Sequence, residues 1–225
     1  MWPDLGQPAP RADAVPYSPL TWPSGSCVSL DSGDLGCGEL STTTLKTRRT
    51  LREFGPISLK ALGPWFELSC RVLALQTSEL GFDLTRRPAP SAGAIHPIHV
   101  VLAGPSDSSW YRYDPFLHAL LSFECAVDSR ETHESMQTIV PASNATLVLL
   151  VAEPGRTQAK YANSTSLVWR DSGALLATMG IAAHALSLAF CPLGATGEPW
   201  ASRLLEKQGL AGVGAAFVGR TRSSA

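Results

Sequence analysis

Short apolar segments in the middle of the sequence limit the fold most strongly. Residues 98–103, 110–113, 120–124 and 146–152 are rich in Val, Leu, Ile and aromatic residues, and turn-forming residues bound them. This composition and length are typical of β-strands. We therefore predict a sheet in the middle of the domain, with residues 212–218 as a further strand near the end of the chain.

The longest predicted helix covers residues 169–190. A second stripe of this helix consists of small residues, Gly173, Ala177 and Gly180. Small residues let another backbone, a cofactor or a second subunit come close, although tight core packing is the commoner reason for such a stripe. The main stripe is apolar and has the three- and four-residue spacing of one helix face: Leu175, Met179, Ala182, Leu186 and Phe190.

A shorter helix is predicted to begin at Leu59, with Ser58 as its N-cap. Pro64 limits this first piece because proline does not fit a helix interior. A second apolar segment follows at residues 65–80. We expect helices before the sheet as well as after it.

Composition divides the chain into two parts. Residues 1–40 contain many Pro and Gly and lack apolar periodicity, so we expect a Pro/Gly-rich N-terminal arm that is mobile or loosely docked. Residues 41–225 are expected to form one domain. A chain of 225 residues that is 44% apolar can bury one sizeable core.

Charge and cysteine content exclude several classes of protein. The formal net charge of −1 gives no general attraction to nucleic acids or anionic membranes, so we expect neither as a partner. We find no apolar run of transmembrane length and no signal peptide, and we expect a cytoplasmic protein. The five cysteines form no CxxC pair, and His96 and His99 have no Cys, Asp or Glu at metal-ligand spacing. Reduced thiols and no metal site are therefore predicted.

Three polar stretches are candidates for binding or catalysis. Residues 46–52, KTRRTLR, offer guanidinium groups and a hydroxyl that suit a phosphate, although a solvated helix start is the simpler interpretation. Residues 89–97, APSAGAIHP, combine prolines with small residues directly before a predicted strand. Lys160 and Tyr161 form an adjacent pair that is by itself common on protein surfaces.

The order of these stretches resembles that of the nitroreductase superfamily. Arg-Arg-Thr comes first and Pro-Ser-Ala-Gly-Ala-Ile-His-Pro precedes a strand, followed by Tyr-Arg-Tyr-Asp-Pro, Lys-Tyr, Trp-Arg-Asp-Ser-Gly, Cys-Pro-Leu-Gly and Val-Gly-Arg. Over residues 45–222 the pattern is most similar to SagB-type dehydrogenases, which include azoline (thiazoline/oxazoline) dehydrogenases. The resemblance implies a nitroreductase-like α+β fold with a central mixed or antiparallel sheet flanked by helices. It also implies an intertwined homodimer with FMN where the subunits meet.

The resemblance further implies which residues hold the FMN. Arg48, Arg49 and Thr50 match the phosphate-binding segment of the family, and Arg220 and Arg222 match the basic residues after its last strand. A loop of the family lies along the isoalloxazine ring, and a second short segment places backbone near the same ring. The matching residues of this chain are Pro90, Ser91, Ala92, Gly93, Leu193 and Gly194.

Oxidation of an azoline ring is the activity that the resemblance implies. Lys160 and Tyr161 match the Lys-Tyr pair of azoline dehydrogenases, in which Lys160 would be the general base and Tyr161 would orient or shuttle the proton. The substrate would be a thiazoline or oxazoline on a peptide or carrier-bound natural-product intermediate, with a cyclase or synthetase as partner. Adjacent strand residues point to opposite faces, so a loop or a helical turn must bring both side chains to one site.

Two other functions stay open. An NAD(P)H-dependent FMN reductase of nitro, quinone or dehydroamino-acid substrates would use the same scaffold. A non-catalytic scaffold subunit of a biosynthetic complex would bind no flavin.

Four further polar residues are interpreted as structural. Asp171 is expected to cap the N-terminus of the long helix. His118 follows a predicted turn, and His184 is expected in the core or in an interface. Cys191 is expected to be packed, although it stands close in sequence to the second flavin segment.

Overall fold

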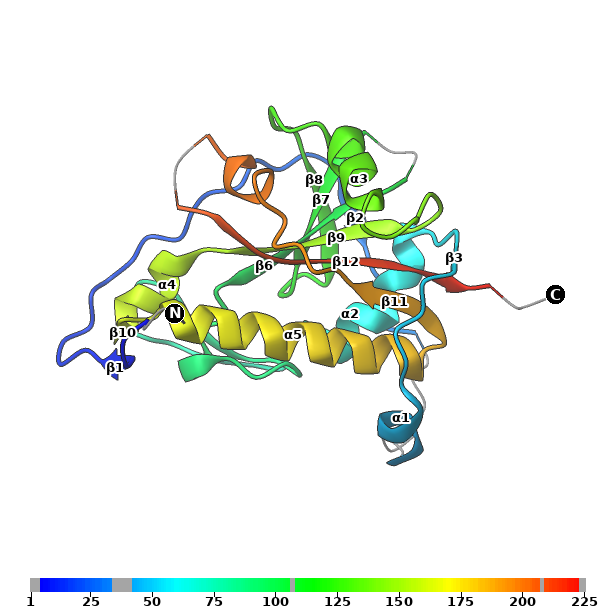
Figure 1. The fold of residues 1–225 in the computed structure, drawn as a ribbon. Helices are drawn as coiled ribbons and strands as arrows, with labels where there is room; N and C mark the ends of the chain where they lie inside the picture. Colours follow the sequence, from blue (N-terminus) through cyan, green and yellow to red (C-terminus); the bar gives the residue numbers. More distant parts are fainter. Residues whose placement is uncertain (1–4, 34–41, 106–107, 207–208, 223–225) are drawn as a thin grey trace.

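The computed structural model describes residues 5–33, 42–105, 108–206 and 209–222, and its main element is an eight-stranded sheet (Figure 1). All strand pairs of this sheet are antiparallel. The strand order is β11-β12-β9-β6-β7-β8-β2, and β3 pairs with β12. The strands are β2 (Cys27–Ser29), β3 (Phe54–Gly55), β6 (Ile98–Ala103), β7 (Trp110–Asp114), β8 (Ala119–Phe123), β9 (Thr146–Ala152), β11 (Leu188–Pro192) and β12 (Ala211–Thr221).

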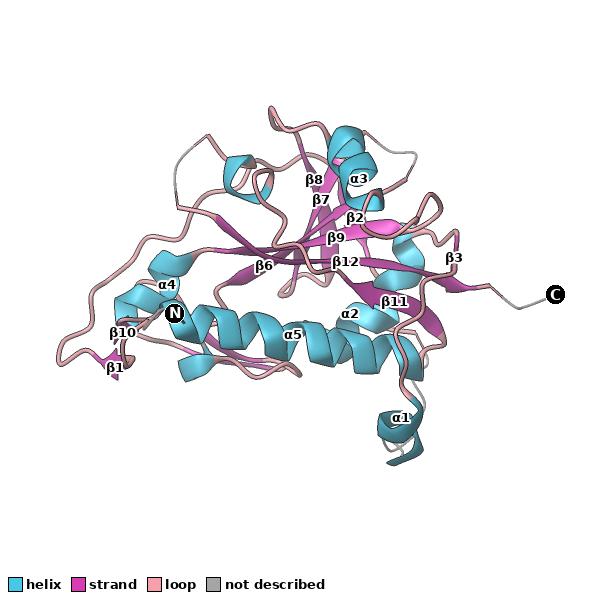
Figure 2. Ribbon diagram, viewed as in Figure 1, coloured by secondary structure: helices cyan, strands magenta, loops and turns pink. Residues whose placement is uncertain are grey.

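Helices cover both faces of this sheet (Figure 2). The long helix α5 packs with α2 on one face, and α3 lies on the other. The predicted α+β class, with an antiparallel sheet flanked by helices, is confirmed. No helix in the described ranges is long and apolar enough to span a membrane. The helices are α1 (Thr42–Thr47), η1 (Leu59–Leu62), α2 (Gly63–Ser69), η2 (Ala92–Ala94), α3 (Ser129–Gln137), α4 (Pro154–Lys160), α5 (Thr165–Ala185) and η3 (Ala201–Arg203).

Strand β9 lies at the centre of the core, because all seven of its residues are buried. It pairs with β6 on one side and with β12 on the other. Its side chains alternate between the two faces: Val148 and Leu150 join the core with α2 and α5, and Leu147 and Leu149 join the core with α3. Burying one such side chain stabilises the fold by about 1.5–3 kcal/mol. The apolar run that predicted the sheet therefore supplies both halves of the core.

Helix α5 begins and ends earlier than the sequence predicted. It covers Thr165–Ala185, whereas the prediction covered residues 169–190. Ser187 has a positive φ of 55°, which ends the helix, and Phe190 lies in β11 opposite Val218. The prediction was wrong at this end because the apolar spacing continues to Phe190, which is buried in β11 and not in the helix.

The region between β3 and β6 also differs from the prediction. Ser58 precedes the short helix η1 without a side-chain capping hydrogen bond. Pro64 lies in the first turn of α2, where the helix does not need the proline N–H. The apolar segment 65–80 divides between α2 and strand β4, Ala74–Gln76, which pairs with β5, Leu84–Arg86.

The described part of the N-terminal segment runs along the domain and pairs with it twice. Strand β1 (Ala9–Pro10) pairs with β10 (Tyr161–Ala162), and β2 extends the edge of the main sheet beside β8. Trp22 packs on His99 and Phe123, with ring centroids 5.1 Å and 5.3 Å apart. The other residues of the predicted arm lie outside the described ranges, and its mobility stays a prediction.

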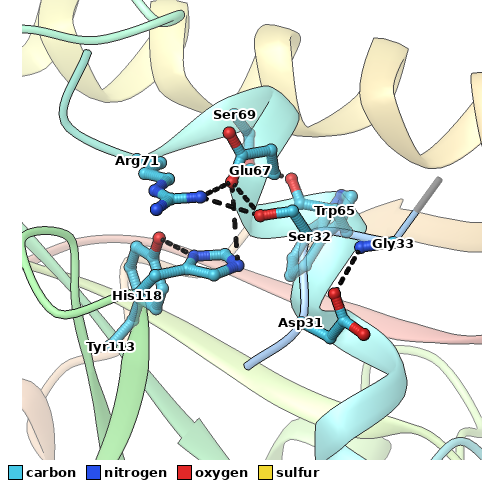
Figure 3. A network of polar contacts seen from close by, with 9 residues as sticks. All are labelled: Asp31, Ser32, Gly33, Trp65, Glu67, Ser69, Arg71, Tyr113 and His118. Atoms are coloured by element: carbon cyan, nitrogen blue, oxygen red, sulfur yellow. Dashed lines mark hydrogen bonds and ion pairs between the residues drawn. The ribbon is translucent and has the colours of Figure 1, made fainter. Parts of the chain in front are cut away.

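A polar network holds the end of this N-terminal segment against α2 (Figure 3). Ser32 Oγ donates to Glu67 Oε2 over 2.7 Å, and Arg71 donates to Ser32 and pairs with Glu67. His118 is buried beside them, with Nδ1 2.8 Å from Tyr113 Oη and Nε2 3.8 Å from Glu67 Oε2. This placement supports a structural role for His118.

Candidate functional site

The sequence APSAGAIHP folds into a tight loop, residues 89–97, that a carboxylate of α5 holds in place. Ser91 Oγ donates to Asp171 Oδ2 and accepts a hydrogen bond from the His96 N–H over 2.9 Å. The Ala92 N–H donates to Asp171 Oδ1 over 3.0 Å. Gly93 has a φ of 63°, in the left-handed region that favours glycine. The loop therefore has a fixed shape on the side that α5 contacts.

Asp171 is not the helix N-cap that the sequence predicted. Because α5 begins at Thr165, Asp171 lies inside the helix and its side chain faces the loop. Burial raises the pKa of Asp171, and the hydrogen bonds from Ser91 and Ala92 oppose that rise. We interpret Asp171 as a positioning residue for the loop.

Lys160 and Tyr161 bring their polar ends to this loop. A Cβ atom added to Gly93 would lie 2.8 Å from Tyr161 Oη and 3.0 Å from Lys160 Nζ. Lys160 ends α4 and Tyr161 begins β10, and this change of backbone conformation lets adjacent side chains reach one place. Strand β1 supports the junction, since the Arg11 N–H donates to the Lys160 carbonyl over 2.9 Å. Two stretches that the sequence singled out separately therefore meet in space.

A second candidate region, which we call the basic hollow, lies beside the later half of α5. It has a volume of about 360 Å³, with residues 48–50 on one side and α5 and β11 on the other. The Leu51 N–H donates to the Phe190 carbonyl over 3.3 Å and so joins the basic segment to β11. The small residues of α5 leave room for this hollow. Its lining includes Arg48, Arg49, Thr50, Ala177, Gly180 and Pro192.

The other residues predicted for the cofactor differ in their relation to the basic hollow. Leu193 is buried directly after Pro192, which lines the hollow. A Cβ atom added to Gly194 would meet nothing within 4 Å, so this glycine faces open space. Arg220 and Arg222 are exposed at and beyond the end of β12 and do not contribute to the wall of the hollow.

The loop and the basic hollow lie at different parts of α5. Asp171 contacts the loop, and Gly180 lines the hollow. These residues are nine positions apart, or about 13.5 Å along the helix axis. Among the residues that the structure describes, none from the 89–97 loop lines the hollow. One chain therefore presents the two regions as separate surfaces.

The remaining polar candidates have local partners. His99 Nε2 lies 2.8 Å from Glu153 Oε2, and His184 Nε2 lies 3.0 Å from Thr47 Oγ1. Cys191 is buried in the core on the α3 side of the sheet, where burial raises the pKa of its thiol. The described part of the chain holds no group of three or more potential metal ligands.

Sequence reasoning missed a cavity that the loop helps to line. Its walls include Arg87, Arg112 and Arg156. Arg86 and Arg87, directly before the loop, were the local signal for it. The other two arginines lie too far along the chain for spacing to reveal that they share one cavity.

Several solved structures share this fold. A protein from Ralstonia eutropha JMP134, assigned by name as a nitroreductase, has a TM-score of 0.64 at 23% identity, over 94% of this chain and 99% of that one. A chain of the E. coli microcin synthetase McbBCD complex, with truncated pro-MccB17 bound, has a TM-score of 0.57 at 15% identity, over 84% and 75%. A protein from Anabaena variabilis ATCC 29413, also assigned as a nitroreductase, has a TM-score of 0.57 at 17% identity, over 91% and 40%. These likenesses show the fold.

Comparison of the sequence with families of proteins gives the family. A search of the curated proteins found no match. The model of the Nitroreductase family matches residues 45–216, which include the basic segment, the 89–97 loop and the Lys160–Tyr161 junction. This match covers most of the chain. The protein therefore belongs to the nitroreductase family and is an oxidoreductase of that family.

Proposed function

We propose that this protein is an FMN-dependent dehydrogenase of the SagB type, which oxidises thiazoline or oxazoline rings on a peptide or carrier-bound intermediate. The observation that carries the proposal is the approach of Lys160 Nζ and Tyr161 Oη to Gly93. A Lys-Tyr pair is what the resemblance to azoline dehydrogenases predicts at the flavin site. The fold likeness to a chain of the microcin synthetase complex agrees with a role beside cyclase or synthetase partners.

Two regions of the described chain fit two parts of one FMN molecule: the loop fits the ring, and the basic hollow fits the phosphate. At the 89–97 loop, the lack of a side chain at Gly93 lets Lys160 Nζ and Tyr161 Oη come close to the backbone along which the flat ring is proposed to lie. In the basic hollow, guanidinium and hydroxyl groups offer the donors that a phosphate binds. When bound, FMN accepts the two electrons that leave the substrate as a hydride. The residues that we propose to hold it are Arg48, Arg49, Thr50, Pro90, Ser91, Ala92, Gly93, Leu193, Gly194, Arg220 and Arg222.

A homodimer is the form that would join the two places. On one chain they lie about 13.5 Å apart along α5. This face of α5 is open: Trp169, just before Asp171, is 45% exposed, and a Cβ atom added to Gly173, between the two places, would meet nothing within 4 Å. A second copy of α5 can approach such a face closely. The basic hollow of one copy would then face the loop of the other.

Lys160 and Tyr161 carry out the proton transfer of the proposed reaction. Lys160 Nζ takes the proton from the α carbon of the azoline ring, and the electron pair of that C–H bond forms the new ring double bond. Tyr161 Oη lies beside the same position and orients the amine or passes the proton on. General base catalysis of this kind contributes about 10²–10⁴ to a rate.

Mass spectrometry of a synthetic thiazoline-containing peptide tests the proposal. The protein with FMN and oxygen is expected to lower the mass of the peptide by about two units per ring while oxygen is consumed. Lys160→Ala is expected to keep its FMN and to lose about 10²-fold or more of the rate. Lys60→Ala is the matched control, because Lys60 is an exposed lysine of η1. Full oxidation by Lys160→Ala with FMN bound would contradict the role of Lys160.

The same preparation distinguishes the alternatives. NADPH consumption with a nitroaromatic or quinone acceptor, without azoline oxidation, would replace the proposal with a reductase. If the purified protein binds no added FMN, the function that remains is that of a non-catalytic scaffold subunit.

A further inference from the structure

The 89–97 loop helps to line a cavity of about 120 Å³, which we call the arginine cavity. One water needs about 10–15 Å³ of such space, so the cavity can hold several waters or a small organic molecule. Three guanidinium groups, those of Arg87, Arg112 and Arg156, form the charged part of its wall. The apolar part of the wall includes Ala89, Ile98, Val100, Phe116 and Leu175.

Two of the three arginines have an acidic partner at long range. Arg112 Nη2 lies 3.8 Å from Asp114 Oδ2, and Arg156 Nη1 lies 3.9 Å from Glu153 Oε2. Both carboxylates have shorter contacts elsewhere. Asp114 Oδ1 accepts hydrogen bonds from two backbone N–H groups, and Glu153 Oε2 lies 2.8 Å from His99 Nε2. These acids therefore leave much of the guanidinium donor capacity unused.

Arg87 has no acidic partner among the residues that the structure describes. Its Nε donates to Thr85 Oγ1 over 3.0 Å. Burial lowers the pKa of Arg87 to about 10, which leaves the guanidinium charged at neutral pH. Arg156 Nε is also buried, and within the described ranges it has no hydrogen-bond partner. A charge held away from water without a close counter-charge is costly, so Arg87 favours an anion in this cavity.

Among the other titratable groups of the cavity, Asp114 is an acid whose charge acts on Arg87, but it lies beyond ion-pair distance. Asp171 accepts its hydrogen bonds from Ser91 and Ala92 in the loop. The ring of His96 is neutral, because burial and the nearby charge of Arg87 lower its pKa to about 3. The cavity therefore combines Arg87, which has no close ion-pair partner, with a wall that is partly apolar and partly polar; Ser69, Ser91 and Tyr113 are among its polar residues.

We propose that the arginine cavity binds a small organic carboxylate, held by Arg87 and Arg156, with its carbon body against the apolar wall. A guanidinium offers two parallel N–H donors that match the two oxygens of a carboxylate. The apolar walls favour an organic acid over an inorganic oxyanion, which prefers polar surroundings on every side. Neither arginine belongs to the proposed FMN site, although the cavity shares Pro90 and Ser91 with that site.

Isothermal titration and thermal unfolding of the full chain, with isobutyrate as the probe, test this proposal. Isobutyramide is the matched neutral probe of similar shape, and sodium chloride controls for ionic strength. We expect millimolar isobutyrate to bind and to raise the Tm, with no such effect of isobutyramide or chloride. Absence of isobutyrate binding, or equal binding of isobutyramide, would overturn the proposal. Tighter binding of inorganic phosphate would overturn its assignment to an organic acid.

Arg87→Gln is expected to weaken isobutyrate binding about tenfold or more. It is also expected not to lower the Tm of the ligand-free protein, because it removes a charge that is held away from water and has no close ion-pair partner. Arg86→Gln is the matched control, because its side chain is exposed next to Arg87. Unchanged affinity in Arg87→Gln would overturn the proposal.

A second variant keeps the test decisive if Arg87→Gln does not fold. Arg87→Lys retains the charge without the planar fork and is expected to bind isobutyrate more weakly than the wild type. Equal affinity of this variant and the wild type would overturn the fork-like contact with the carboxylate. FMN content, measured on each variant and expected to be unchanged, separates failure here from failure of the proposed flavin site.

Discussion

The two regions beside α5 differ in how they are held. At the 89–97 loop, Asp171 accepts hydrogen bonds from Ser91 and Ala92, and two polar side chains crowd the position of Gly93. At the basic hollow, the Leu51 N–H joins the segment to β11, and small residues of α5 leave open space. In the proposed function, the loop supplies fixed geometry and the hollow supplies charged groups for the cofactor. Changes at the loop should therefore affect the reaction rate, and changes at the hollow should affect affinity for the cofactor.

Gly93→Ala should have the largest effect, because it breaks the fixed geometry of the loop. The new Cβ would lie 2.8 Å from Tyr161 Oη and 3.0 Å from Lys160 Nζ, so both groups must move. We expect azoline oxidation to fall about 10²-fold, as small displacements of reacting groups do. The positive φ should also lower the free energy of unfolding by about 1–2 kcal/mol. Steady-state rates and urea unfolding measure the two effects.

Gly209→Ala is the control for this variant. Gly209 is exposed and also has a positive φ, of 133°, and a Cβ atom there would lie 3.4 Å from Leu20 Cδ1, an ordinary contact. We expect it to keep the oxidation rate and to lower the unfolding free energy. Full activity of Gly93→Ala would show that the Lys160 and Tyr161 positions do not matter to the reaction.

Asp171→Asn should have the next largest effect, because it removes one of the two acceptor oxygens that hold the loop. We expect a loss of about 1 kcal/mol in unfolding free energy, and a loss of rate without loss of FMN. Asp83→Asn, at an exposed position, is the control. A variant with wild-type stability and rate would contradict the positioning role.

The pH dependence of the same variant sharpens this prediction. Burial raises the pKa of Asp171 above its ordinary value of 3.8, so the folded state binds the proton more tightly than the unfolded state does. The contribution of Asp171 to stability is complete below pH 3.8 and is lost as the pH rises through the higher folded pKa. The Asp171→Asn variant should lack this loss of stability with rising pH. Urea unfolding at a series of acidic pH values measures the difference.

Arg48→Gln should weaken FMN binding about tenfold, which corresponds to the loss of one charged contact of about 1.4 kcal/mol. At saturating FMN the oxidation rate should return, because the loop is untouched. Fluorescence titration of FMN measures the affinity, with Arg130→Gln on the exposed face of α3 as control. Unchanged affinity would remove Arg48 from the proposed cofactor site.

Thr50→Val should have the smallest effect, because it removes one hydroxyl from the basic hollow and keeps the shape of the side chain. We expect a loss of about threefold in FMN affinity, as for one neutral hydrogen bond, and no change in rate at saturating FMN. The same fluorescence titration serves as the measurement. A loss as large as that of Arg48→Gln would mean that charge does not dominate binding in the hollow.

The sheet could be predicted from sequence because its central strands are buried on both faces. Residues 98–103 and 146–152 form apolar runs bounded by turn residues, and the structure has strands with these bounds. The end of the long helix could not be predicted, because the apolar spacing continues to Phe190 in spite of the turn at Ser187. Apolar periodicity indicates which residues are buried, and here a strand rather than a helix buries Phe190.

Part of the candidate site could also be predicted from the sequence. The family order singled out the loop, Lys160 and Tyr161, and the structure brings them together. The contact of Asp171 with the loop depends on where α5 begins, and no local pattern revealed that start. The arginine cavity draws Arg87, Arg112 and other residues from distant segments, so it exists as a feature of the tertiary structure alone.

The pairing of β1 with β10 means that the family span alone lacks a contact that supports the candidate site. The family match begins at residue 45, yet Pro10 pairs with Tyr161 and the Arg11 N–H bonds to the Lys160 carbonyl. A fragment cut at the family boundary would keep both proposed proton-transfer residues and lose the strand that supports their backbone. Transplanting the domain, or comparing relatives over the family span alone, would overlook a determinant of function that lies outside it.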